Sequence, residues 1–533
     1  MLYTVIFISG GAILALELLA SRIMTPYFGV SLYIWTGILS ITLISLALGY
    51  WAGGRIAGVT RERFRERLTH YYALMPAIAA LSIVGACLLY PFVFSLLAGW
   101  SLVFGAFAAG LILLFLPLVA TSAMNPLLVA IALHDTERRP GDAGAGKVFF
   151  VSTIGSVAGV IVTAFGMTPY LSNFAATLAV ALILALLSLA MALAPAIALA
   201  GRPRIAGTAI VAACAALLLL WQADAYTGRA QPAAYAGRVW QVEASFGSLF
   251  GTVKVLRSKP DVEGGEFLRI YFQDGLTQNT VDSRGRSMSF YTYALEALTR
   301  AYRPGLHRAL VLGLGAGIVP MQLARSGIAV DVVEIDAASL AVAQQFFGFD
   351  PRHARVHHAD ARAFVRDCPE RYDAVVVDLF HGDGTPDYLV TREFFRDLKS
   401  CLADDGIAVF NTFADLEEPQ SYADLLATLH AEMPHVAMFR PDWPGVSQLN
   451  SFLVAAPRPL PQPNKITLDY VPERHADTLW SMLASPRMVD GVALSGGRIV
   501  SDALNAGVRD LARAQLAYRR SVVEAMPPAL LLN

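Results

Sequence analysis

Residues 309–336 read ALVLGLGAGIVPMQLARSGIAVDVVEID. The pattern predicts a short apolar strand, a glycine-rich turn, a helix, and a second strand that ends in an acid. Gly313, Gly315 and Gly317 would let the backbone approach a ligand closely, because glycine has no Cβ, and the helix N-terminus presents unpaired N–H groups. Glu334, about twenty residues past the first glycine, stands where a carboxylate can hold ribose hydroxyls. The stretch therefore predicts a site for a nucleoside-containing cofactor.

The rhythm of strand, helix and strand continues after this stretch, which is typical of a parallel sheet with helices on both faces. We predict its strands at 309–312, 330–334, 355–358, 373–378 and 407–411. Ligands of such sheets bind beyond the carboxyl ends of the strands, and Asp360 and Asp378 stand at two of these ends. Upstream, the β-branched and aromatic content of 247–256 and 267–274 predicts a small β region.

The glycine pattern favours one class of cofactor over another. The dinucleotide fingerprint G-x-G-x-x-G requires glycine at its sixth position, where this chain has Ile318. The pattern here is G-x-G-x-G. Together with the acids that follow the next three strands, it favours a Rossmann-like fold of the AdoMet type over an NAD enzyme.

The composition predicts a second, membrane-bound part. The chain has 533 residues and is 55% hydrophobic, with a mean hydropathy of +0.51, which is too apolar for an ordinary soluble protein. Long apolar stretches, each nearly or fully long enough to cross a bilayer, occur before residue 222. We place them at 3–20, 32–53, 72–92, 102–122, 148–168, 174–195 and 205–221.

Basic residues follow every second stretch, in the segments 55–67, 138–147 and 202–204. The positive-inside rule then places the N-terminus and these segments in the cytoplasm. With seven crossings, the C-terminal half would emerge on the extracytoplasmic side of a bacterial inner membrane, whereas the supply of a cytosolic cofactor favours the cytoplasmic side. The sequence leaves the two alternatives open.

Other features narrow the range of partners. A net charge of −1 without a basic stripe argues against nucleic-acid binding. The cysteines contain no C-x-x-C pair and the histidines lack metal-ligand spacing, so we predict neither a metal site nor a disulfide framework. The predicted division is a seven-helix membrane domain, a linker, a β lead-in with the acceptor region, a Rossmann-like catalytic domain and a C-terminal extension, at 1–221, 222–240, 241–300, 301–457 and 458–533.

Several of these motifs also carry a family resemblance. YFQDGLTQNTVD (271–282), GLGAGI (313–318), VEID (333–336), HADARAFV (358–365) and VVVDLFHGDGTPDYLVTREFF (375–395) follow one another in the chain. In content and order they resemble the spermidine synthase (polyamine aminopropyltransferase) family across residues 245–415. ELLASRIMTPYFG (17–29) and VFFVSTIGSVAG (148–159) are similar to the membrane domain of its multi-pass bacterial branch.

The resemblance implies transfer of an aminopropyl group from decarboxylated AdoMet to an amine such as putrescine. Glu334 would then bind the ribose hydroxyls, Asp360 with Ala361 alongside would hold the adenine amino group, and Asp378 would orient and deprotonate the attacking amine. The residues that it implies for the acceptor site are Gln278, Asp282, Tyr291 and Asp383, and His381 is a further candidate base there.

The chain also departs from the family pattern. Ala316 stands where the family's glycine loop has an aspartate that contacts the donor's amino group, and Gly251 stands where the family has a glutamine on the lead-in strand. Two alternatives therefore remain: an AdoMet-dependent methyltransferase acting on an amine or a membrane-presented substrate, and a non-catalytic nucleoside sensor or transporter. The expected partners are the lipid bilayer and a small amine, and the sequence leaves open whether the chain forms a homodimer.

Overall fold

The computed structural model describes residues 1–30, 32–59, 64–135, 144–195, 197, 199–227, 232–260, 265–379, 385–415, 419–443, 448–489, 494, 496–504 and 519–532. The chain divides into two compact units. One comprises residues 1–237 with 520–533, and the other residues 238–519.

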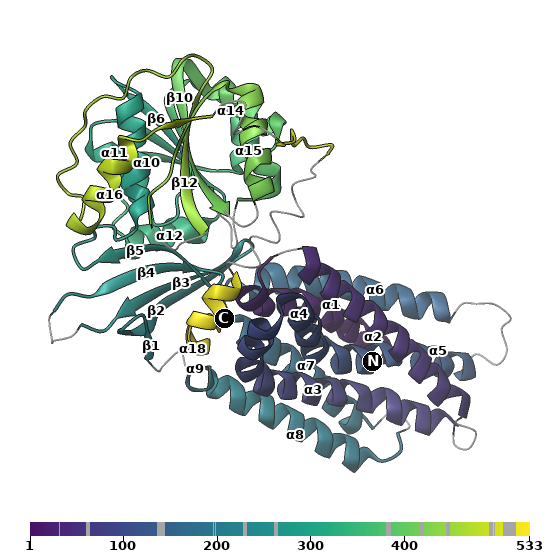
Figure 1. The fold of residues 1–533 in the computed structure, drawn as a ribbon. Helices are drawn as coiled ribbons and strands as arrows, with labels where there is room; N and C mark the ends of the chain where they lie inside the picture. The colour runs from purple at the N-terminus through teal and green to yellow at the C-terminus, as the bar shows by residue number, and fades with distance from the viewer. Residues whose placement is uncertain are drawn as a thin grey trace. The chain divides into compact units, whose positions relative to one another are not determined.

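The first unit is helical (Figure 1). Its described helices are α1 (Leu2–Phe28), α2 (Leu32–Val59), α3 (Phe64–Trp100), α4 (Leu102–Gly110), α5 (Leu116–Asp135), α6 (Ala145–Ile161), α7 (Asn173–Leu193), α8 (Arg202–Trp221), α9 (Ala223–Tyr226) and α18 (Pro528–Leu531). The π-helical turns η1 (Leu111–Phe115) and η2 (Val162–Met167) join α4 to α5 and extend α6. In the described part of the chain, seven helical stretches are long and apolar enough to cross a membrane. Each overlaps one of the seven stretches predicted from sequence.

Small residues bring two of these helices into close contact. A Cβ on Gly155 of α6 would lie 1.9 Å from the carbonyl oxygen of Phe7 of α1, and one on Gly159 would lie 2.2 Å from that of Gly11. The Ser156 hydroxyl donates a hydrogen bond of 2.9 Å to the Gly10 carbonyl. Backbones can approach this closely only where side chains are absent, so the glycines determine where α1 and α6 meet.

The second unit begins with a sheet of order β1-β2-β3-β4-β5, which is antiparallel from β2 to β5. Its strands are β1 (Ala233–Tyr235), β2 (Arg238–Ser248), β3 (Gly251–Ser258), β4 (Leu268–Gln273) and β5 (Leu276–Asp282). The predicted strand 247–256 was wrong, because it spans the end of β2, a turn and most of β3. The turn ends at Gly251, whose φ of 139° is a conformation that favours glycine. The range predicted as a linker, 222–240, contains α9, β1 and the start of β2.

The larger sheet is mixed, with the order β13-β11-β12-β10-β9-β6-β7-β8. Its strands are β6 (Arg308–Leu312), β7 (Ala329–Glu334), β8 (Ala354–His358), β9 (Tyr372–Val377), β10 (Leu402–Asp415), β11 (His435–Phe439), β12 (Gln448–Ala456) and β13 (Arg487–Met488). The five strands predicted from sequence correspond to β6 to β10, and these are parallel. The prediction missed the antiparallel strands β11, β12 and β13.

Helices cover both faces of this sheet (Figure 1). They are α10 (Phe290–Tyr302), α11 (Ile318–Arg325), α12 (Ala337–Phe346), α13 (Ala361–Arg366), α14 (Arg392–Cys401), α15 (Pro419–Glu432) and α16 (Glu473–Leu483), with a 3-10 turn η3 (Asp387–Leu389). One core packs α10, α11 and α16 on the sheet, and the other packs α13, α14 and α15. Because Leu479 and Met482 of α16 are buried in the first core, part of the predicted C-terminal extension completes the domain.

The order of the strands opens a cleft at one point. The chain places β7 and β8 on one side of β6, and β9 and β10 on the other side. Connections therefore leave β6 and β9 in opposite directions, which is where open α/β sheets bind ligands. The backbone N–H of Asp378, directly after β9, bonds to the Leu312 carbonyl at the end of β6 at 2.9 Å. The loops after β6 and β9 thus lie side by side.

One covalent link was not predicted. Cys368, two residues after α13, forms a disulfide with Cys401 at the end of α14, with the two Cα atoms 5.6 Å apart. Spacing alone did not reveal the pair, because the cysteines are 33 residues apart and are brought together only when α13 and α14 pack side by side. Cys87 and Cys214 are free.

Candidate active site

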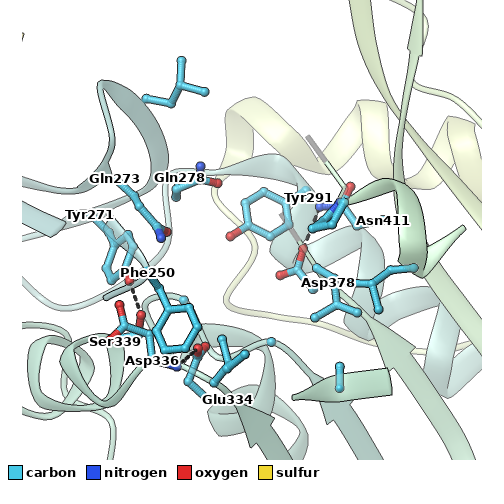
Figure 2. Close-up of a pocket in the computed structure, with 18 of the residues that line it drawn as sticks. Phe250, Tyr271, Gln273, Gln278, Tyr291, Glu334, Asp336, Ser339, Asp378 and Asn411 are labelled. Atoms are coloured by element: carbon cyan, nitrogen blue, oxygen red, sulfur yellow. Dashed lines mark hydrogen bonds between the residues drawn. The ribbon is translucent and has the colours of Figure 1, made fainter. Parts of the chain in front are cut away.

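A cavity of about 580 Å³ opens at the carboxyl ends of the parallel strands. Figure 2 shows Asp378 grouped with Tyr291 and Asn411 at one end, and Glu334 grouped with Asp336 and Phe250 at the other. The wall between them comes from β4, β5 and the start of α10. The described residues of the lining are Phe250, Tyr271, Gln273, Leu276, Thr277, Gln278, Ser289, Phe290, Tyr291, Gly313, Gly315, Val333, Glu334, Ile335, Asp336, Ser339, Ala359, Asp360, Ala361, Asp378, Leu379, Pro386, Tyr388, Leu389, Asn411, Phe413, Trp443 and Asn450.

The glycine loop serves two different purposes. Gly313 and Gly315 line the cavity, and a Cβ on Gly313 would lie 2.3 Å from the Asp378 carbonyl oxygen, so glycine there lets the two loops meet. Gly317 precedes α11 with a φ of 74°, and a Cβ there would lie 2.7 Å from the ring of Phe349. Gly317 is therefore outside the described cavity lining and has a packing role, although the sequence pattern grouped it with the cofactor residues.

Glu334 is fixed by the two loops that it joins. Its Oε2 accepts a bond of 3.0 Å from the Leu314 backbone N–H, and its Oε1 accepts one of 2.8 Å from the Asp336 N–H. Burial raises the pKa of Glu334, and these backbone bonds oppose the rise. Each carboxylate oxygen has a further lone pair, so the side chain can still accept hydrogen bonds from a ligand's hydroxyl groups.

Asp336 and Phe250 join the small sheet to this end of the cavity. The Asp336 Oδ1 accepts a bond from the Ala338 N–H and caps α12, while its Oδ2 accepts a bond of 2.8 Å from the Ser248 hydroxyl. The Phe250 N–H in turn donates to the Ser248 hydroxyl oxygen. The turn between β2 and β3 is thereby held over the site, with the Phe250 ring at the cavity wall.

Asp360 and Ala361 lie where the sequence placed them, at the cavity edge after β8. The Asp360 Oδ1 accepts a bond of 2.8 Å from the Ala363 N–H and caps α13. Its Oδ2 accepts a bond of 3.3 Å from the Tyr388 hydroxyl. The carboxylate therefore already has a structural role, and its contact with an adenine amino group stays a prediction.

Asp378 stands at the opposite end, directly after β9. Its Oδ1 accepts a hydrogen bond of 2.8 Å from the Asn411 side-chain amide. Burial raises the pKa of Asp378 to about 6, and the bond from Asn411 opposes the rise. Burial, with a smaller contribution from the charge of Asp378, also raises the pKa of Tyr291. A carboxyl group with this pKa is ionised at neutral pH and can accept a proton there.

The residues predicted for the acceptor site have different locations. Gln278 and Tyr291 line the cavity. Asp282 is not among the described residues of the lining. Its Oδ1 accepts hydrogen bonds from the backbone N–H groups of Arg284 and Arg286, and its Oδ2 pairs with the Arg286 side chain. It forms the turn after β5, so we do not assign it to the acceptor site. His381 and Asp383 lie outside the described residues.

Sequence reasoning missed part of the lining. Asn411 directly follows the apolar run 407–410, which was a usable signal because a buried amide needs partners, and Asn450 lies two residues before the apolar run 452–456. Phe250 and Trp443 carried no such signal, since their positions depend on how the small sheet and the loop after β11 fold over the cleft.

The charge of the lining is one-sided. Among its described residues, four are acids, namely Glu334, Asp336, Asp360 and Asp378, and none is lysine, arginine or histidine. Among the described residues, no three His, Cys, Asp or Glu side chains are grouped so that they could hold a metal ion. The described lining is therefore suited to a cationic ligand.

Ala316 and Gly251, the two residues that depart from the family pattern, are closely packed against other residues. Ala316 is buried in a cluster with Val253, Val255 and Tyr271, and it is absent from the described lining of the cavity. At Gly251, a Cβ would lie 2.2 Å from a carboxylate oxygen of Asp274. Neither position offers a polar side chain to a ligand.

Part of the second unit is similar to known proteins. A family model described as the spermine/spermidine synthase domain matches residues 288–443. A polyamine aminopropyltransferase of Vibrio vulnificus is 38% identical over 119 residues, which are 21% of this chain and 40% of that protein. An N-terminal histidine N-methyltransferase of Emericella nidulans is 36% identical over 137 residues, which are 25% of this chain and 24% of that protein. The chain thus spans less than half the length of these two relatives.

A solved structure of a probable spermidine synthase from Corynebacterium glutamicum is 18% identical, with a TM-score of 0.38, and the match covers 50% of this chain and 96% of that one. The family match is the more specific finding, because it includes the glycine loop, Glu334, Asp378 and Asn411. Residues 288–443 of this chain are thus similar to the spermine/spermidine synthase domain.

Proposed function

We propose that the chain is a transferase that moves an aminopropyl group from decarboxylated AdoMet to an amine such as putrescine. The observation that carries the proposal is the charge of the cavity, whose described lining has four carboxylates and no basic side chain. Decarboxylated AdoMet has a sulfonium and an ammonium group and no carboxylate. The carboxylate of AdoMet itself would find no basic side chain in the described lining to pair with it, which is unfavourable for a charge that leaves water.

In this proposal, Glu334 holds the ribose and Asp378 acts on the acceptor amine. An ammonium group has no lone pair, so attack requires that it first lose a proton, and Asp378 accepts that proton. The amine lone pair then forms a bond to the propyl carbon beside sulfur as the carbon–sulfur bond breaks. The electron pair of the broken bond stays on sulfur, which leaves as the neutral thioether methylthioadenosine. Gln278 and Tyr291 stand beside the attacking amine.

A methyltransferase is the second candidate, and one observation favours it. Ala316 stands where the family pattern has an aspartate, so this position lacks a negative charge that would repel the carboxylate of AdoMet. The same cleft would then transfer the methyl group of AdoMet to an amine. Both candidates use Glu334 for the ribose, and they differ in which donor binds.

Calorimetry on the full-length protein in detergent separates the two. We expect decarboxylated AdoMet to bind at least about tenfold more tightly than AdoMet, a difference of about 1.4 kcal/mol, because only AdoMet brings a carboxylate into a described lining without a basic side chain. Tighter binding of AdoMet would support the methyltransferase instead. Binding of both donors and of methylthioadenosine, without turnover on any amine, would favour the nucleoside sensor.

We further propose that the seven apolar helices cross the bilayer and that the catalytic unit is extracytoplasmic. The arginine-rich segments after the second, fourth and sixth of these helices support a cytoplasmic N-terminus, and an odd number of crossings then ends outside. The disulfide between Cys368 and Cys401 supports the same side, because such bonds persist in oxidising compartments and are rare in the cytosol. The donor must then be available outside the cytoplasm.

Alkaline phosphatase, which is active only where its own disulfides form, tests this orientation. Fused after Asn533 it should be active, and fused before Met1 it should be inactive. Alkylation of the unfolded, non-reduced protein should detect two free thiols out of the four cysteines. An inactive C-terminal fusion together with four free thiols would place the catalytic unit in the cytoplasm.

A further inference from the structure

Three neighbouring strands bring a row of polar side chains to one end of the cavity. Asp378 directly follows β9, and the register of β9 with β10, in which Val377 pairs with Phe410, places Asn411 beside it. Asn411 of β10 pairs with Phe452 of β12, so Asn450 is its diagonal neighbour on the same face. The sheet itself therefore aligns Asp378, Asn411 and Asn450.

Hydrogen bonds connect the row in one direction. The Asn450 side-chain N–H donates to the Asn411 Oδ1 at 2.9 Å, and the Asn411 side-chain N–H donates to the Asp378 Oδ1 at 2.8 Å. A primary amide can be turned so that either its oxygen or its nitrogen faces a neighbour. Because Asn450 donates to the oxygen of Asn411, the nitrogen of Asn411 is the atom that faces the carboxylate.

We propose that Asn411 and Asn450 are positioning residues that hold Asp378 ionised and leave its second carboxylate oxygen available to the acceptor amine. Asn411 supplies the hydrogen bond, and Asn450 keeps the amide of Asn411 in the orientation that donates it. The assignment of an amine as the proton donor rests on the proposed function. The expected effect of the two asparagines on the pKa of Asp378 does not depend on the proposed function.

The groups around Asp378 show why this bond matters. Its carboxylate lies beside Tyr291 of α10, a phenol whose own pKa is raised, and beside the neutral Asn411 of β10. Neither residue is a cation that could replace the hydrogen bond. A bond to a buried charge is worth more than one between neutral groups, so its loss should be visible as a change in the pH at which Asp378 ionises.

The test compares Asn411→Leu and Asn450→Leu with Asn464→Leu, which alters an exposed asparagine elsewhere in the same unit. The pKa of Asp378 is measured in the ligand-free, full-length protein from the infrared band of its protonated carboxyl group, identified as the band lost in Asp378→Asn. We expect Asn411→Leu to raise this pKa by about 1–2 units. Asn450→Leu should raise it by less, because Asn411 keeps its amide, and Asn464→Leu should leave it unchanged.

The pH dependence of turnover gives an independent measurement. In the Asn411→Leu protein the acidic limb of kcat/KM should move to higher pH by the same amount, with activity recovering toward wild type on the alkaline side. An equal loss of kcat/KM at every pH, or an unchanged pKa of Asp378 in both variants, would overturn the proposal. If the pKa moves as expected and no amine accepts an aminopropyl group, the positioning role stands and the proposed function fails.

Discussion

Asp378→Asn is expected to lower kcat for aminopropyl transfer by about 10²–10⁴-fold, the usual range for loss of a general base. The affinity for methylthioadenosine should stay within a few-fold, because the proposed function assigns the nucleoside to Glu334 at the other end of the cavity. The amide of the variant can fill nearly the same space, but it cannot accept a proton from an ammonium group. Steady-state kinetics with putrescine and calorimetry with methylthioadenosine measure the two effects.

The wild-type pH profile belongs to the same expectation. Because burial raises the pKa of Asp378 to about 6, the carboxyl group is protonated below that pH and cannot act as a base. The value of kcat/KM should therefore fall about tenfold per pH unit below about pH 6, and this limb should be absent from any residual activity of Asp378→Asn. Asp469→Asn, which alters an exposed aspartate, is the control. Turnover that survives Asp378→Asn essentially unchanged would remove this residue from the mechanism.

Glu334→Gln is expected to weaken the binding of methylthioadenosine by about 10²–10³-fold. Both oxygens of the carboxylate accept backbone N–H groups, from Leu314 and Asp336. A glutamine would place its NH₂ group against one of these donors, which disturbs the glycine loop and removes bonds to a charged acceptor worth about 1.5–3 kcal/mol each. Methylthioadenosine is the appropriate probe, because it contains the nucleoside without the aminopropyl group.

The control is Glu473→Gln on the exposed first turn of α16, which should leave the calorimetric dissociation constant unchanged. Unfolding midpoints of both variants establish whether the domain stays folded. A Glu334→Gln protein that is folded and binds methylthioadenosine as tightly as wild type would show that the ribose is recognised elsewhere in the cavity.

The sequence alone was sufficient where the determinants are local. The glycine loop and Glu334 belong to one strand–helix–strand unit, so the interval between them already predicts that Glu334 lies beside the glycine loop. In the structure, the Leu314 N–H of this loop donates a hydrogen bond to Glu334. The seven apolar helices could be predicted for a similar reason, since the length of an apolar helix is a property of consecutive residues. The same holds for the parallel strands β6 and β9, each of which is a short run rich in apolar residues.

Tertiary structure decided the features that depend on pairing between distant segments. The reversal of strand order at β6 brings Asp378 against Gly313, and the insertion of β12 between β10 and β11 places Asn450 beside Asn411. Local sequence also could not show that Asp282 has its oxygens occupied by its own turn, or that Cys368 meets Cys401 across two packed helices. A side chain's neighbours across a sheet are set by strand order and register, and neither quantity is contained in any single stretch of the chain.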